Sequence, residues 1–447
     1  MSTAVASMGG HSKRYPLTNG VNPWLIAAAV MSATFMEVLD TSVANVALPH
    51  IAGTLSATNE EATWVLTSYL VSNAIVLPAT AWFSGIFGRK RFLVTCIILF
   101  TFSSFLCGVA TSLPMLIGAR ILQGVGGGAL QPIAQAVLLE SFPREKRGQA
   151  MAVYAMGIVV APVIGPTFGG WITDNFTWRW VFLINLPVGV LAVFMTSLFV
   201  SDPPYAQKQK TARIDFAGIM LMIIWIGTLQ VVLDKGEQDG WWDATWIKAA
   251  TVIISLGFVS FIWRELTAEH PIVDLRVFAN RNFLVGTTLI AVVGAALYGT
   301  VALLPLFLQT LMGYPALQSG MAVSPRGIGA FFGSIVVGRI VARVDNRLLI
   351  AAGFLVLAHG AYELTQINLE IAFSNIVIPN IVMGVGLSMI FVPLLTVTMG
   401  TLRNDQLANA TGIYSLMRNI GGGLGISAVT TLLARAIRFI RMCWLVI

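Results

Sequence analysis

Two acidic side chains, Glu37 and Asp40, lie three residues apart inside an apolar stretch near the start of the chain. This spacing places both carboxyl groups on one face of a helix. A carboxyl group in apolar surroundings can bind and release a proton, because burial disfavours its charged form. We therefore predict that both residues take part in proton coupling, with Asp40 as the first candidate. The alternative for each is a structural hydrogen bond or ion pair.

Three arginines in other apolar stretches are candidates for buried charges. Arg120 shares a helix face with Gln123, and a guanidinium at that depth needs an acidic or carbonyl partner. A fixed structural charge pair is one interpretation of Arg120. Arg326 and Arg418 are expected to pair with acids or to line a cavity, and a structural role is favoured for both. Asn185 is predicted to be a structural hydrogen-bond donor.

The composition shows which elements must position these groups. The chain has 447 residues, of which 56% are apolar and 11% are charged, and its mean hydropathy is +0.81. Soluble domains carry about 25% charged residues, so a cytosolic enzyme is excluded. In lipid the backbone must bond internally, which favours helices of about 20 apolar residues. We predict an all-α polytopic membrane protein with thirteen spans. They lie at 24–48, 63–83, 92–110, 114–139, 151–172, 180–200, 215–233, 246–263, 283–310, 316–337, 348–365, 374–399 and 406–434.

The basic residues predict the orientation of these spans. The net charge is +7, and most Lys and Arg side chains fall in one alternate set of connecting segments. The opposite set holds Arg179, Lys235 and Lys248. Basic loops stay on the cytoplasmic side of a membrane, so the N-terminus is predicted to be cytoplasmic.

The predicted spans divide the chain into segments around a basic linker at 201–214. Two short basic turns, at 81–91 and 338–347, resemble each other and each follow the second helix of a set. Such repeats are typical of secondary transporters with two related halves around a central site. The predicted segments are a cytoplasmic tail (1–23), a six-helix bundle (24–200), the linker (201–214), two extra membrane helices (215–263), a cytoplasmic loop (264–282), a five-span C-terminal bundle (283–434) and an atypical tail (435–447).

Five motifs along the chain then suggest a family. They are LDTSVANVALP at 39–49, RILQG at 120–124, APVIGPTFGG at 161–170, WRWVFLINLPVG at 178–189 and PIVDLRVF at 271–278. In this order they resemble the major facilitator superfamily, and more closely its fourteen-helix drug:proton antiporters of the EmrB/QacA type. The resemblance implies a major facilitator fold with two pseudo-symmetric six-helix halves, two extra central helices, and a last helix that is missing or replaced here.

The resemblance also implies roles for particular residues. It supports Asp40 as a proton-coupling group and assigns Arg120 to proton transfer or to modulating a nearby acid. The fifth span carries an antiporter motif that implies a bendable, closely packed helix. The resemblance also implies that a short basic loop takes part in the conformational change. The motif residues are Gly165, Pro166, Gly169 and Gly170, and the loop residues are Gly88, Arg89, Lys90 and Arg91.

The chain departs from the family pattern in two places. Gly85 stands where the family loop usually holds an Asp, and the matching position in the second half is Ala342. The resemblance implies that this loop holds the two halves together through charged contacts. The missing acid argues against such a contact in this chain. The family also continues to a fourteenth helix, so a truncated or frame-shifted C-terminus is expected.

The resemblance implies export of amphipathic toxic compounds, driven by inward proton movement, across a Gram-negative inner membrane. It implies a periplasmic membrane-fusion adaptor and an outer-membrane channel as partners. A dedicated metabolite or siderophore exporter and an inactive fragment without transport are the alternatives. The three cysteines and four histidines show no metal-ligand spacing. We expect no metal, no cofactor besides the proton gradient, no nucleic acid and no enzyme activity.

Overall fold

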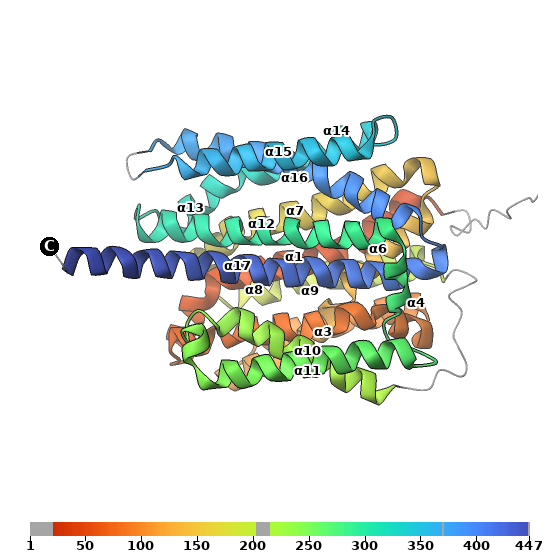
Figure 1. The fold of residues 1–447 in the computed structure, drawn as a ribbon, viewed down its shortest axis with the longest axis horizontal. Coiled ribbons are helices and arrows are strands. Elements are labelled where there is room, and N and C mark those ends of the chain that lie inside the picture. Colours follow the sequence, from red (N-terminus) through yellow and green to blue (C-terminus); the bar gives the residue numbers. More distant parts are fainter. Residues whose placement is uncertain (1–20, 203–214, 369–370, 446–447) are drawn as a thin grey trace, which may run out of the picture.

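The computed structural model describes residues 21–202, 215–368 and 371–445 (Figure 1). Within these ranges every regular element is a helix, and twelve helical segments are long and apolar enough to cross a membrane. Most of these helices run side by side along one direction. The predicted all-α polytopic class is confirmed. Residues 1–20 of the predicted tail and residues 203–214 of the predicted linker lie outside the described residues.

The first helix group comprises the elements before the predicted linker. Its helices pack mainly against one another, with α1 central to the group and in contact with α6, α7 and α9. The elements are α1 (Pro23–Thr54), α2 (Asn59–Ala62), α3 (Trp64–Phe87), α4 (Arg89–Gly108), α5 (Leu113–Gly127), α6 (Leu130–Ser141), η1 (Arg144–Lys146), α7 (Arg147–Asn175), α8 (Trp180–Leu183) and α9 (Asn185–Phe199).

The remaining elements form an edge pair and a second helix group. The helices α10 and α11 pack on each other and, through α10, against α3 and α17. In the second group, α12 packs along α17 and α16 packs against α14 and α15. The elements are α10 (Phe216–Lys235), η3 (Trp241–Asp243), α11 (Thr245–Thr267), η4 (Leu275–Ala279), α12 (Arg281–Thr310), α13 (Ala316–Val323), α14 (Pro325–Ile340), α15 (Asn346–Thr365), α16 (Phe373–Gly400), η5 (Asn404–Gln406) and α17 (Leu407–Leu445).

The structure differs from the sequence predictions in detail. The predicted span at 114–139 consists of α5 and α6, because a glycine run ends α5 and Pro132 in the first turn of α6 lacks a backbone donor. The span at 316–337 is broken in the same way at Pro325. The predicted span at 406–434 falls on α17, which continues to Leu445 and is not among the twelve apolar segments.

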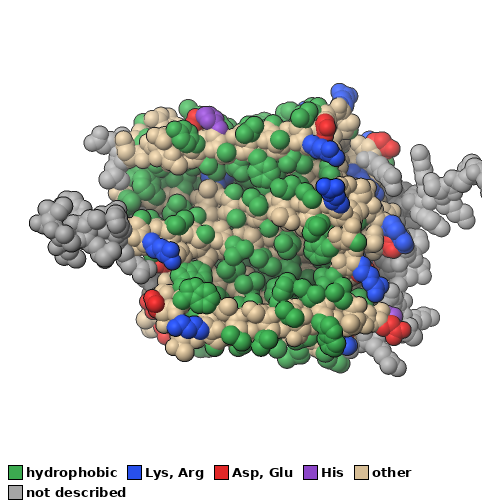
Figure 2. Space-filling view, viewed as in Figure 1, with side chains coloured by type: hydrophobic (Ala, Val, Ile, Leu, Met, Phe, Trp, Pro, Cys, Tyr) green, Lys and Arg blue, Asp and Glu red, His purple; other side chains and the backbone are tan. Residues whose placement is uncertain are grey.

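Glycines allow the central helices to approach closely. Gly421 and Gly425 of α17 lie against the backbone of Ala291 and Ala295 in α12, where an added Cβ atom would collide with the carbonyl oxygens. Small residues at four-residue spacing are how helices pack in membranes, since lipid supplies no hydrophobic drive for association. The outer surface is apolar instead: Leu355 is 73% exposed and Leu256 65% exposed. Figure 2 shows hydrophobic side chains across the middle of one face of the bundle, with most charged side chains near its ends.

Candidate functional site: a central cavity and two buried acids

A cavity of about 370 Å³ lies between the two helix groups and α10. Its wall reaches from the middle of α1 to the end of the bundle where α10 ends, because Glu37 and the loop residues Glu237 and Gln238 all line it. The polar side chains in this wall come from seven helices, α1, α3, α5, α6, α10, α12 and α17, and from the loop after α10. They include Glu37, Tyr69, Asn73, Gln131, Asp234, Glu237, Tyr298 and Asn419.

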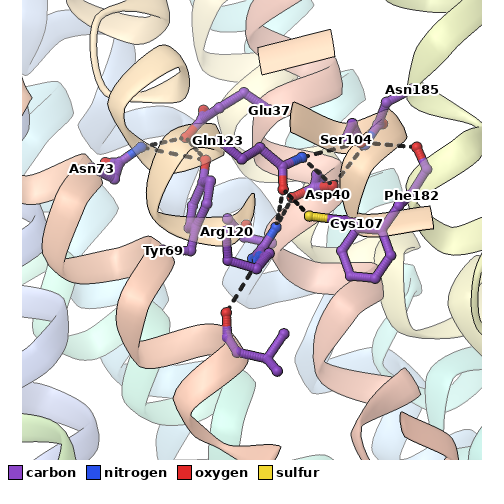
Figure 3. A network of polar contacts seen from close by, with 12 residues as sticks. Glu37, Asp40, Tyr69, Asn73, Ser104, Cys107, Arg120, Gln123, Phe182 and Asn185 are labelled. Atoms are coloured by element: carbon purple, nitrogen blue, oxygen red, sulfur yellow. Dashed lines mark hydrogen bonds and ion pairs between the residues drawn. The ribbon is translucent and has the colours of Figure 1, made fainter. Parts of the chain in front are cut away.

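Asp40 forms a buried ion pair and does not line the cavity (Figure 3). The Arg120 Nη1 atom lies 2.6 Å from Asp40 Oδ2. The other carboxylate oxygen, Oδ1, accepts hydrogen bonds from Asn185 Nδ2 at 2.6 Å and from Gln123 Nε2 at 3.1 Å. Asp40 is 1% exposed and Arg120 is fully buried. The charge of Asp40 is therefore compensated on both oxygens.

Further contacts hold Arg120 in place. Its Nε donates to the Val65 carbonyl oxygen at 3.1 Å, and its Nη1 also donates to Gln123 at 2.7 Å. The guanidinium lies over the Tyr69 ring, 4.2 Å from its centroid, and 5.5 Å from that of Phe182. Arg120 thus contacts both kinds of partner expected for a buried guanidinium, an acid and a carbonyl oxygen, and Gln123 and Asn185 both donate to the same carboxylate.

Glu37 has a different environment one turn earlier on α1. Its Oε1 accepts from Tyr69 Oη at 3.0 Å and Asn73 Nδ2 at 3.1 Å (Figure 3). Its Oε2 accepts from Gln131 Nε2 at 2.6 Å. All three donors are neutral. Within the described part of the chain, no cation lies at ion-pair distance from Glu37. Glu37 also lines the cavity, so a proton arriving there could bind it.

The two arginines of the second helix group lie in different places. Arg418 of α17 is 1% exposed, and its Nη2 donates to Gln131 Oε1 beside Glu37. Arg326 of α14 is fully buried away from the cavity wall. Its donors contact Thr300 at 2.9 Å, Asn380 at 3.2 Å and the Met383 sulfur at 3.5 Å. The structure thus brings Arg418, but not Arg326, to the site.

The glycine–proline motif of α7 lies against α1. Because Pro166 has no N–H, the Pro162 carbonyl oxygen loses its helical partner, and Ser42 Oγ of α1 donates to that oxygen at 2.9 Å. Gly165 and Gly169 face Ser42 and Val43 so closely that an added Cβ atom would be crowded. Gly170, the fourth motif residue, is buried in the same helix. The motif thus makes a close, cross-bonded contact two to three residues beyond Asp40.

The predicted basic loop lies at the end of the bundle, remote from the cavity. Gly88 has a φ of +85°, which favours glycine and ends α3. Arg89 pairs with Glu140 of α6, while Lys90 bonds Asp202 and the Ser197 carbonyl. Arg91 is exposed.

The two positions that depart from the family pattern lie in open surroundings at this end. Among the described residues, no neighbouring atom lies within 4 Å of an added Gly85 Cβ atom, and Ala342 is exposed. Packing of Gly148 against Val341 and of Gly338 against Ala152 joins α7 and α14 there instead.

Sequence reasoning missed several cavity residues. Gln131, Tyr69 and Asn73 are common residue types in apolar stretches, and only their contacts with Glu37 reveal them. Asp234 follows the predicted span at 215–233 directly and bonds Thr67 of α3, so an acid at a span end was an available signal. Among the described residues no cluster of metal-ligating side chains occurs.

Comparisons with known proteins agree with this fold and site. A model of the Major Facilitator Superfamily matches residues 30–426. The multidrug export protein EmrB of Haemophilus influenzae is 37% identical over 95% of this chain and 83% of its own. The fatty acid resistance protein FarB of Neisseria gonorrhoeae is 38% identical over 94% and 83%. A crystal structure of the human organic anion transporter MFSD10 (TETRAN) matches with a TM-score of 0.66 and 12% identity, over 92% of this chain and 93% of its own.

The fold and site define a multi-pass membrane transporter rather than an enzyme. The chain belongs to the major facilitator superfamily, within its group of EmrB-like export proteins. The family resemblance predicted from the five motifs is thereby confirmed.

Proposed function

We propose that this transporter exports amphipathic toxic compounds out of the cell in exchange for protons. The names of its relatives, multidrug export protein and fatty acid resistance protein, support an export function. The cavity supports a permissive site, because it combines apolar groups such as Leu66, Leu70 and Leu233 with a few polar groups. Such a wall tolerates many ligands.

The single observation that carries proton coupling is the environment of Glu37. This carboxyl group lines the cavity, bonds only neutral donors and touches no cation directly, so its protonation breaks no ion pair. Asp40 cannot be protonated without leaving Arg120 as a buried charge lacking its acid. We therefore assign proton binding to Glu37, and a fixed supporting role to the Asp40–Arg120 pair.

The proposed orientation gives the cavity a direction. We place the N-terminus in the cytoplasm of a cell with an inner membrane, as the basic segments predict. The cavity then opens to the outside, where a proton enters and the exported compound leaves. The two helix groups correspond to halves that rock about this site, with α10 and α11 as additional helices. We also propose that a periplasmic membrane-fusion adaptor and an outer-membrane channel receive the compound.

Everted membrane vesicles that contain the transporter test this proposal. An imposed pH gradient, acid inside, is expected to drive uptake of a fluorescent amphipathic dye. Glu37→Gln is expected to reduce this uptake at least about tenfold, whereas Glu61→Gln, at an exposed acid that does not line the cavity, leaves it unchanged. Dye uptake that proceeds equally without the pH gradient would contradict proton-driven export.

A further inference from the structure

The Gln131 side chain connects the two helix groups at the level of Glu37. Its Nε2 donates to Glu37 Oε2 of α1 at 2.6 Å, and its Oε1 accepts a hydrogen bond from Arg418 Nη2 of α17. Gln131 itself belongs to α6, which packs against both of these helices. One neutral amide therefore lies between an acid of the first group and a cation of the second.

The orientation of this amide follows from its neighbours. A guanidinium can only donate hydrogen bonds, so the amide oxygen must face Arg418. The amide nitrogen must then face Glu37, where it requires an acceptor. Only a Glu37 oxygen without a proton satisfies this arrangement, so the geometry fits an ionised Glu37.

Protonation of Glu37 weakens this arrangement at either oxygen. A proton on Oε2 would oppose the Gln131 Nε2 donor directly. A proton on Oε1 could be accepted by the Tyr69 hydroxyl, which can turn, but the remaining bond to Gln131 would lose its charge assistance. In both cases the negative charge that faces Arg418 through the amide disappears.

Arg418 depends on that charge. Among the residues that the structure describes, no carboxylate lies at ion-pair distance from Arg418, and its Nε and Nη1 have no hydrogen-bond acceptor. The other groups around Glu37 give no substitute, because Arg120 and Asp40 neutralise each other. The titratable and charged groups that face this region are Asp40 of α1, Tyr69 of α3, Arg120 of α5, Tyr154 of α7, Asp234 of α10, Tyr298 of α12, and Tyr414 and Arg418 of α17.

We propose that Gln131 is a positioning residue that transmits the protonation of Glu37 to Arg418, so that the link between α1 and α17 is strong while Glu37 is ionised and weak once it is protonated. A proton that reaches Glu37 weakens this link and lets the helix groups move relative to each other. The inference rests on the proposed proton-coupled function and adds the side chain that links proton binding to movement.

The test measures conformation rather than transport, so that it is independent of the exported compound. Spin labels are attached through Thr111→Cys and Leu311→Cys, both exposed positions at the cavity end of the two groups. Cys443→Ser removes a third thiol, and Cys96 and Cys107 are buried. Electron–electron distance measurements between about pH 5 and about pH 9 report the ratio of the two conformations in liposomes.

The parent protein is expected to change this ratio at least about tenfold over the pH range. Gln131→Leu, Gln131→Met and Arg418→Gln are each expected to reduce the change below about twofold. Gln135→Leu is the matched control, because Gln135 is a buried glutamine one turn further along α6 that does not line the cavity; it keeps the full pH response. The Glu37→Gln variant and the Glu37→Gln, Gln131→Leu double variant are expected to show the same pH response. Both lack the Glu37 charge, so Gln131 has no change of charge to transmit to Arg418.

Two results would overturn the inference: a full pH response in folded Gln131→Leu or Gln131→Met, or no pH response in the parent. If Gln131→Leu does not fold, Gln131→Met and Arg418→Gln decide. A parent that changes conformation with pH but moves no dye along a pH gradient would refute the proposed export function and leave this inference standing.

Discussion

Glu37 and Asp40 lie on one face of the same helix, yet they have opposite environments. Asp40 does not line the cavity and bonds a cation, Arg120, together with two amides. Glu37 lines the cavity and bonds a hydroxyl and two amides, all of them neutral. The difference teaches that an intramembrane acid is not by itself a proton carrier. The partner decides, because a fixed counter-charge holds the acid in one charge state.

Removing the Asp40 charge is expected to have the largest effect on stability. A small effect would contradict the contrast between the two acids. Asp40→Asn leaves the fully buried Arg120 without its acid, at a cost of about 3–5 kcal/mol in folding stability. Thermal unfolding of the purified protein in detergent measures this loss. Asp40→Asn combined with Arg120→Gln should be more stable than Asp40→Asn alone. A stable Asp40→Asn protein that has lost only proton-driven transport would instead show that Asp40 is the proton carrier.

Ser42 extends the comparison of fixed and exchangeable contacts along α1, because it forms a second fixed contact of this helix, with α7. Ser42→Ala removes the hydrogen bond that Ser42 donates to the Pro162 carbonyl oxygen, whose usual helical donor Pro166 lacks, and this loss should cost about 1–3 kcal/mol. Ser32→Ala is a suitable control, since Ser32 only bonds the Ala29 carbonyl of its own helix. Both unfolding midpoints are compared in detergent. Equal midpoints for the two variants would mean that the α1–α7 contact does not need this bond.

A substitution of Tyr69 tests the environment of Glu37, and it is expected to have the smallest effect on stability. Tyr69→Phe removes the hydroxyl that donates to Glu37 but keeps the ring over Arg120. The loss of one hydrogen bond is expected to cost about 0.5–1.5 kcal/mol, with a changed pH profile of transport. Tyr69→Leu, which also removes the ring, should destabilise the protein further. An unchanged pH profile in Tyr69→Phe would indicate that this donor does not influence proton binding.

The fold class, the approximate spans and the presence of buried charges could be predicted from the sequence. Hydropathy suffices for the spans because lipid imposes length and apolarity on every crossing helix. The breaks at 128–129 and at Pro325 depend on how each helix packs, so hydropathy alone did not predict them. The sequence also could not distinguish the environments of Glu37 and Asp40. Their three-residue spacing shows that the two acids share a helix face, but it does not show which residues of other helices contact each acid. Gln131 carries no local signal; only the positions of Glu37 and Arg418 give it a role.

Proton release on ligand binding tests the central claim most directly. Purified transporter in weakly buffered detergent solution is mixed with an amphipathic dye that it exports, and a pH indicator follows the protons released. If Glu37 exchanges protons with the cavity while Asp40 stays paired, the parent protein releases protons and Glu37→Gln, which still binds the dye, releases none. Undiminished proton release from Glu37→Gln would contradict the assignment of proton binding to Glu37.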